Sequence, residues 1–148
     1  MTPTLIETEA FVRRLFFGVV DKAGEPYVEH CVRVMEGLPA AATDDERHAA
    51  LLHDVLEDTD LTARDLHLSG YSERTVWLVQ RLTKWKGADY GAYVAAITAS
   101  RDAGLIAIKR ADLKDNSDPA RLALLPARER ERLAAKYASA REILEAWK

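Results

Sequence analysis

Apolar residues recur along this chain at the spacing of three and four residues that is typical of amphipathic helices. The first such segment, residues 8–20, places five apolar side chains on one face: Phe11, Val12, Leu15, Phe16 and Val19. Clusters rich in Gly, Pro and small polar residues separate this segment from the later ones. The pattern predicts helices over residues 8–20, 26–36, 45–56, 63–68, 73–82, 89–100, 104–116 and 128–148.

One of these segments, residues 104–116, is apolar enough at its start to fit a buried strand as well as a buried helix. Its neighbours on both sides have helical periodicity, which favours the helix. No other segment resembles a strand. We therefore expect an all-α fold, a single-domain helical bundle. A chain of 148 residues is most simply one domain and is long enough to bury a core of its own.

Composition narrows the possible classes of protein. The chain is 48% hydrophobic and 30% charged, which is ordinary for a soluble globular domain. Its net charge of −3 does not provide the basic surface that nucleic-acid binding needs. Its first residues do not have the basic-then-apolar pattern expected of a signal peptide, and no apolar run approaches the roughly 20 residues needed to span a membrane. The single cysteine, Cys31, cannot form an internal disulfide. We expect a cytoplasmic protein without nucleic-acid or membrane partners, whose oligomeric state the sequence does not indicate.

The most unusual segment is His53-Asp54-Val55-Leu56-Glu57-Asp58. On a continuous helix, His53 would share a face with Glu57, and Asp54 with Asp58. This face would hold one imidazole and three carboxylates with no lysine or arginine among them. Such a group repels itself unless a metal ion or another cation lies there. The remaining residues of the segment are apolar and predict a buried opposite side. A further histidine, His48, has no motif around it and is predicted to lie at the surface or at a helix end.

Two other segments offer ligands for the same ion. His30 lies on the second predicted helix, and Asp112 lies in an otherwise apolar segment where a carboxylate needs a cationic partner. Together with His53 and Asp54 they form a set of two imidazoles and two carboxylates. This mixed set suits Mn²⁺, Fe²⁺ or Zn²⁺ better than Mg²⁺ or Ca²⁺. It leaves coordination positions for water and a phosphate oxygen, and a metal lowers the pKa of its water.

The ordered set of His, His-Asp and Asp resembles the HD-domain metal-dependent phosphohydrolases. More narrowly, it resembles the guanosine tetraphosphate (ppGpp) hydrolase domain of the RelA/SpoT proteins and of small stand-alone hydrolases. Three segments carry this resemblance: residues 24–30 (Gly-Glu-Pro-Tyr-Val-Glu-His), 53–59 (His-Asp-Val-Leu-Glu-Asp-Thr) and 111–116 (Ala-Asp-Leu-Lys-Asp-Asn). The resemblance predicts one HD-type domain over residues 1–148, with its motifs within about 11–119 and a C-terminal helix over about 128–147.

The resemblance also implies roles for individual residues. The metal, Mn²⁺ in this family, would be held by His30, His53, Asp54 and Asp112. Catalysis beyond the metal would belong to Glu57 and Asp58, which would orient or deprotonate the attacking water and handle the proton of the leaving group. Substrate contacts would come from Lys22, Asn116, Thr83 and Lys84. Relatives remove the 3′-pyrophosphate of ppGpp and release GDP, so the implied partner is a small-molecule nucleotide.

One position departs from the family pattern. Asp21 stands where relatives carry an arginine that stacks on the base and faces a phosphate, so its charge is reversed. Three functions therefore stay open: a ppGpp pyrophosphohydrolase, another nucleotide phosphohydrolase such as an NADPH 2′-phosphatase or a nucleotidase, and a non-catalytic metal-bound nucleotide sensor. Glu57 and Asp58 weigh against the sensor, because catalytic acids have no purpose in a protein without turnover.

Overall fold

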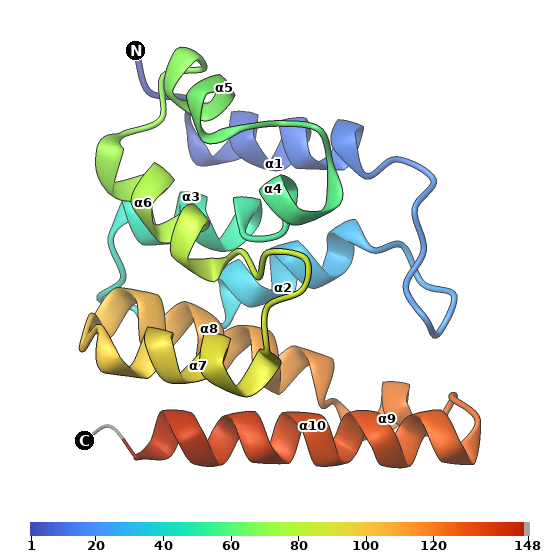
Figure 1. Ribbon diagram of the computed structural model, residues 1–148. Helices are drawn as coiled ribbons and strands as arrows, with labels where there is room; N and C mark the ends of the chain where they lie inside the picture. Colours follow the sequence, from blue (N-terminus) through green and yellow to red (C-terminus); the bar gives the residue numbers. More distant parts are fainter. Residues whose placement is uncertain (147–148) are drawn as a thin grey trace.

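The computed structural model describes residues 1–146 of the chain, and helices make up most of them (Figure 1). Within these residues the backbone forms no strand, and the pairing of Val20 with Pro26 is an isolated bridge in a loop. The all-helical prediction is confirmed. The helices are α1 (Leu5–Leu15), α2 (Val28–Glu36), α3 (Asp44–Leu52), α4 (Val55–Asp58), α5 (Ala63–Leu68), α6 (Glu73–Leu82), α7 (Tyr90–Ala99), α8 (Ala103–Asn116), α9 (Pro119–Leu122) and α10 (Ala127–Glu145).

Local sequence signals set where several helices begin. α1, α3 and α5 start with capping boxes, in which a threonine before the helix and an acid at its third position satisfy each other's backbone amides. In α1 the capping pair is Thr4 and Glu7, so the helix begins three residues earlier than the apolar spacing predicted. It also ends at Leu15, and Val19, predicted to lie on its apolar face, is exposed.

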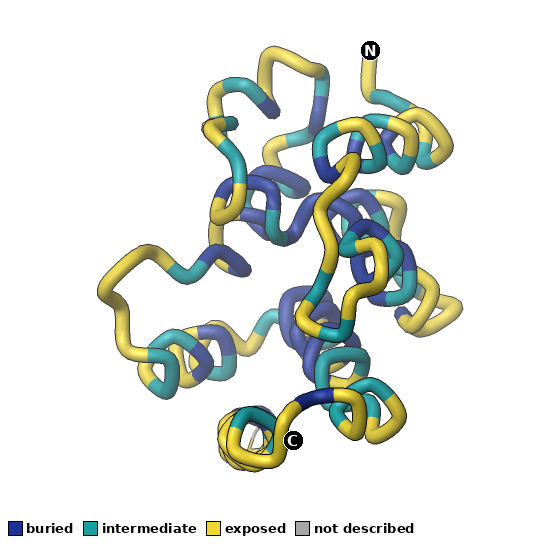
Figure 2. Tube along the Cα trace, turned by 90° about the vertical axis from the view of Figure 1, so that its right-hand side faces the viewer, coloured by how far each residue is buried: buried dark blue, intermediate teal, exposed yellow. Residues whose placement is uncertain are grey.

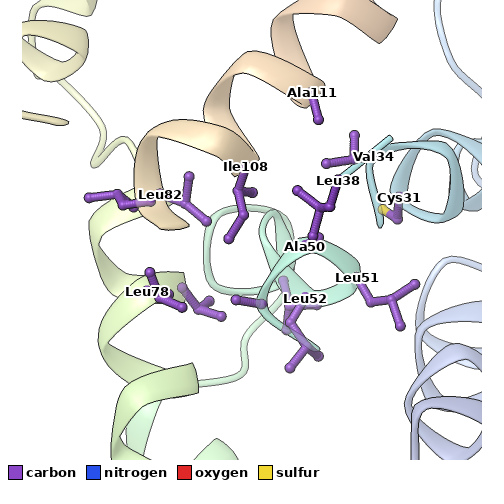
Figure 3. Close-up of a cluster of buried hydrophobic side chains, with 14 of the residues drawn as sticks. Cys31, Val34, Leu38, Ala50, Leu51, Leu52, Leu78, Leu82, Ile108 and Ala111 are labelled. Carbon is purple, nitrogen blue, oxygen red and sulfur yellow. The ribbon is translucent and has the colours of Figure 1, made fainter. Parts of the chain in front are cut away.

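The core forms where α3 packs against α1, α2, α6 and α8. Figure 2 shows buried backbone at the centre of the molecule and exposed turns around it. The apolar side chains of α3, among them Leu51 and Leu52, interlock with Val34 of α2, Leu78 of α6 and Ile108 of α8 (Figure 3). α10 runs along one side of the molecule against α7 and α8 (Figure 1). Among the described residues, no helix is both long and apolar enough to cross a bilayer.

Two helices differ from the prediction. The helix expected over residues 45–56 is two helices, α3 and α4, separated at His53 and Asp54. The short helix α9 was not expected, and Asp118 caps it while Pro119 starts it. The final helix occupies Ala127–Glu145, and position 147 of the predicted helix lies outside the described residues.

The position predicted for His48, at the surface or at a helix end, was also wrong, because His48 is buried in the middle of α3. His48 is 3% exposed, and its Nδ1 lies 2.9 Å from the hydroxyl of Thr8, which in turn lies 2.7 Å from the hydroxyl of Tyr71. This buried polar network joins α1 and α3 to the segment before α6. Burial lowers the pKa of His48, and the charges of Asp44 and Asp45 offset only part of that effect. The folded chain therefore holds this imidazole neutral.

This burial makes the stability of the fold depend on pH. Above the ordinary histidine pKa of about 6.5, His48 is neutral in both the folded and unfolded states. Below it, only the unfolded chain binds the proton, so stability falls as the pH drops toward the lowered folded pKa, by at most about 1.4 kcal/mol per pH unit. Urea denaturation in chelator at pH 7.5 and 5.5 should show a smaller acid loss for His48→Gln than for the wild type. The exposed control His67→Gln should behave like the wild type, and identical pH dependence in all three proteins would contradict the assignment.

Candidate metal centre and active site

The break between α3 and α4 points two adjacent side chains at one place. On a continuous helix, neighbouring residues project about 100° apart. Here His53 is the residue after α3, and Asp54, with φ −103° and ψ 1°, is the residue before α4, so the chain turns at these two residues. His53 Nε2 consequently lies 3.1 Å from Asp54 Oδ2. The leucines and valine around the break remain buried, as predicted.

Helices α2 and α8 bring the other two predicted ligands to the same place. His30 Nε2 lies 3.3 Å from His53 Nε2 and 4.0 Å from Asp54 Oδ2. Asp112 Oδ1 lies 3.0 Å from His30 Nε2 and 3.3 Å from His53 Nε2. The donor atoms of His30, His53 and Asp54 all lie within 4.8 Å of one another. The structure thus brings together all four side chains that the sequence singled out.

Hydrogen bonds behind the two imidazoles orient them toward this centre. His53 donates from Nδ1 to the backbone oxygen of Ala50 at 2.6 Å. His30 donates from Nδ1 to the Asp115 carboxylate at 2.7 Å, and Arg33 in turn holds Asp115 with a bond of 2.7 Å. With the proton on Nδ1, each Nε2 presents a lone pair to the centre, which is how metal-ligating histidines are commonly supported.

The spacing of these atoms fits a first-row metal ion. Ligands about 2.1 Å from a metal lie about 3.0 Å apart at adjacent octahedral positions. Four of the five measured distances, 3.0 to 3.3 Å, are close to this value. The cluster could therefore hold one divalent metal. Four protein ligands would leave two octahedral positions for water and substrate.

Negative charge accumulates around the centre and shifts the pKa values of its groups. Burial raises the pKa of Asp54, and the negative charges of Asp112, Asp58 and Glu57 raise it further, well above the usual range. Burial would lower the pKa of His30, but hydrogen bonds to Asp112 and Asp115 outweigh it and raise that pKa. Both raised pKa values favour the protonated forms of Asp54 and His30. A metal ion that binds these side chains would therefore compete with protons.

Neighbouring side chains that are not themselves predicted catalytic groups help to keep Asp112 ionised. Burial alone would raise its pKa, but Lys109 and the two imidazoles lower it well below the usual range. Lys109 is buried and donates to Asp112 Oδ2 at 2.8 Å, while Asn116 donates to Oδ1 at 3.1 Å. Tyr27 similarly donates its hydroxyl proton to Asp54. These contacts fix the direction of both carboxylates.

The centre opens into a cavity of about 300 Å³, called here the metal-side cavity. Glu57 and Asp58, the predicted catalytic acids, are exposed to solvent from α4 and line it. Burial and the charge of Glu57 raise the pKa of Asp58. Lys84 lines the same cavity, and its backbone amide donates to Glu57 Oε1 at 2.8 Å. The acids are thus beside the centre without belonging to the cluster of ligand atoms.

A second cavity of about 320 Å³ adjoins the first, and Tyr27, Asn116 and Tyr137 line both. Lys22 lines only this side cavity, and its ammonium lies 2.7 Å from Glu129. Asp21 lies in its wall as well. The remaining lining residues are mostly apolar: Val20, Ala23, Leu122, Leu125 and Leu133.

Thr83 is predicted to bind substrate but lines neither cavity. Its side chain is buried, and its hydroxyl donates to the backbone oxygen of Val79 at 2.8 Å. This bond closes the end of α6 and positions the following residue, Lys84, at the cavity. Its predicted substrate contact stays a prediction.

Several residues at the site were not identified from the sequence. Asp115 lies three positions after Asp112 and supports His30, a spacing that could have indicated its part. Tyr90 and Lys136 come from α7 and α10, far from any motif, and no sequence signal places them at this cavity. Tyr27 belongs to the quoted Gly-Glu-Pro-Tyr segment, although no role was assigned to it.

The arrangement of the helices defines the fold class of the protein. Superposition on the solved structure of a metazoan orthologue of SpoT, described as hydrolysing ppGpp, gives a TM-score of 0.82 at 23% sequence identity. The match covers 100% of this chain and 90% of the other. At this identity the likeness establishes the fold, and the chain has the all-helical HD-type architecture.

Sequence comparison identifies more specific relatives. The chain is 37% identical over 102 residues to the guanosine-3′,5′-bis(diphosphate) 3′-pyrophosphohydrolase of Aquifex aeolicus, an alignment covering 64% of this chain and 14% of that protein. It is 36% identical over 108 residues to the enzyme of the same name from Vibrio cholerae, covering 67% of this chain and 15% of that protein. No protein-family profile matches the chain. The resemblance inferred from the motifs is confirmed, although the chain spans only a small part of these relatives.

Replacing Asp54 should separate metal binding from folding. In chelator, Asp54→Asn removes a buried acid with a raised pKa, so we expect an equal or higher melting temperature than the wild type. Added Mn²⁺ should raise the melting temperature of the wild type and have little effect on the variant, because only a bound ion stabilises by mass action. Thermal unfolding with and without Mn²⁺, together with metal analysis, measures both effects.

The exposed acid Asp60 supplies the matched control. Asp60→Asn removes the same charge from a position outside the cavity and should keep the full metal-dependent rise. An equal rise in Asp54→Asn and the wild type would contradict the assignment of Asp54 as a ligand.

Proposed function

We propose that this chain is a metal-dependent pyrophosphohydrolase that acts on the 3′-pyrophosphate of ppGpp, with Mn²⁺ as the preferred metal. The observation that carries the proposal is the convergence of His30, His53, Asp54 and Asp112 beside a cavity that also contains two acids and several lysines. Enzymes with this activity are named among its relatives. The cavity pairs acid groups for water with basic groups for phosphate, as hydrolysis of a phosphate ester requires.

The bound metal would supply a positive site for a phosphate oxygen and a lower pKa for water. Glu57 would accept the proton of the attacking water, since its carboxylate lies at the cavity and its position is held by the Lys84 amide. Asp58 would give a proton to the leaving 3′-oxygen, a role that suits its raised pKa. The bond between phosphorus and the 3′-oxygen breaks, and the products are GDP and pyrophosphate.

The side cavity is the proposed place of the nucleoside. Its apolar wall suits a base, and Asn116 and Tyr27 connect it with the metal centre. Lys22 lines the side cavity, and its ammonium would contact a phosphate there after its ion pair with Glu129 breaks. Lys84 would contact the pyrophosphate from the metal-side cavity.

The reversed charge at Asp21 has a structural explanation that is compatible with this proposal. Asp21 Oδ1 accepts hydrogen bonds from the backbone amides of Ala23 and Glu25, both at 2.9 Å, and so stabilises the loop before α2. Its Oδ2 lies 3.6 Å from Arg121, which lines the side cavity from α9. A guanidinium is thus present in this cavity, supplied by another segment.

A substrate panel tests the proposal and separates it from the two alternatives. The Mn²⁺-supplemented protein should release pyrophosphate from ppGpp and should release little phosphate from NADPH or ordinary nucleotides. Phosphate and pyrophosphate should be measured separately. Preferred release of phosphate from NADPH would support the 2′-phosphatase, and binding of nucleotides without any product would support the sensor.

Glu57→Gln should abolish most turnover while leaving the metal bound. Loss of a general base costs roughly 10²- to 10⁴-fold in rate, and Glu57 is not among the ligand atoms. Initial rates with ppGpp and metal analysis of the purified variant measure the two properties. Glu36→Gln, an exposed acid on α2, should keep normal turnover. Near-normal turnover in Glu57→Gln would exclude the proposed role.

A further inference from the structure

Lys136 is a cation at the metal-side cavity that the preceding roles leave unused. It projects from α10, lines the cavity, and forms no ion pair within residues 1–146. Its ammonium lies 4.3 Å from the ring centre of Tyr90 and 6.0 Å from that of Tyr137. These aromatic faces attract the ammonium and restrict where the long side chain can place it. The charge is therefore held at the cavity without being neutralised.

The other two lysines of the cavity show why Lys136 is distinct. Lys109 is buried, and its ammonium is bound to the Asp112 carboxylate at 2.8 Å, so it supports the metal centre. Lys84 lines the cavity beside Glu57. Burial lowers the pKa of Lys136, and the charges of Arg132, Lys109, Lys22 and Lys84 lower it further. Several cations thus act on Lys136, and a bound polyanion would offset their repulsion.

Lys136 and the two predicted catalytic acids reach the cavity from different parts of the fold. Glu57 and Asp58 come from α4, which lies with α1–α3 in Figure 1, whereas Lys136 comes from α10 and Tyr90 from α7, on the other side of the fold. A phosphate bound at the metal centre lies beside carboxylates, which would repel a second phosphate attached to it. The ammonium of Lys136, in the same cavity, would stabilise that second phosphate.

We propose that Lys136 binds the terminal phosphate of the substrate's pyrophosphate group, the one that is not attacked, and thereby selects pyrophosphate esters over monophosphate esters. This inference rests on the proposed function and deepens it. It gives α10 a direct part in the site, since the helix supplies a substrate-binding cation as well as the cavity wall formed by Tyr137. The contact would be a charge-assisted hydrogen bond from the ammonium to a phosphate oxygen.

Titration calorimetry with Mn²⁺-loaded protein tests this, with inorganic pyrophosphate and inorganic phosphate as probes. Lys136→Gln should weaken pyrophosphate binding by about tenfold, the usual effect of losing one charged hydrogen bond. Phosphate binding should change by less than about twofold, because a single phosphate stays at the metal and distant charges are screened. Lys136→Arg should keep most of the pyrophosphate affinity. In assays with ppGpp, Lys136→Gln should raise KM more than it lowers kcat.

Arg128→Gln is the matched control, because it removes one positive charge from an exposed position on the same helix that does not line the cavity. It should leave pyrophosphate binding unchanged. The inference would be overturned if Lys136→Gln bound pyrophosphate as well as the wild type, or if Arg128→Gln weakened this binding equally. It would also be overturned if Lys136→Gln lost equal affinity for both probes, or if the wild type did not bind pyrophosphate. Circular dichroism confirms that the variants are folded. A wild type that binds pyrophosphate but does not hydrolyse ppGpp would contradict the proposed function alone, since the titration still decides the role of Lys136.

Discussion

Four atoms that accept hydrogen bonds and cannot satisfy one another meet at the centre of this fold. Two imidazole nitrogens with their protons held on the far side of the ring face two carboxylates, at distances of 3.0 to 4.0 Å. Burying this much negative charge is unfavourable, which raises the pKa of Asp54, and the carboxylates bonded to His30 raise the pKa of that imidazole. A divalent metal resolves the conflict, and the surrounding contacts are arranged around that requirement.

The fold delivers these atoms by packing apolar helix faces against one another. α2, α3 and α8 meet in the core, so His30 and Asp112 are fixed by the same contacts that bury Val34 and Ile108 (Figure 3). The break after Leu52 then turns Asp54 toward the imidazoles. Substitutions in this core should therefore affect metal binding without touching a ligand, because a shift of one helix changes every distance in the set.

The sequence predicted the helices and the four candidate ligands because both leave local signals. Apolar spacing and capping residues mark the helices, and the quoted motifs mark the ligands. The break at His53 could not be predicted, because no Gly or Pro marks it in the sequence. The burial of His48 depends on Thr8 and Tyr71, 40 and 23 positions away in the chain. Lys136 was missed for the same reason, because only the packing of α10 on α7 and α8 brings it to the cavity.

The cavity combines a metal centre built from histidines and acids with Lys136 of α10, whose positive charge suits a phosphate. Every step proposed for the reaction depends on the metal centre. X-ray absorption spectroscopy of the Mn²⁺-loaded protein examines it directly, because the technique distinguishes imidazole from oxygen ligands. The account predicts one manganese per chain with two imidazole nitrogens in its coordination shell. A shell of oxygen atoms alone, or a protein that binds no manganese, would contradict it.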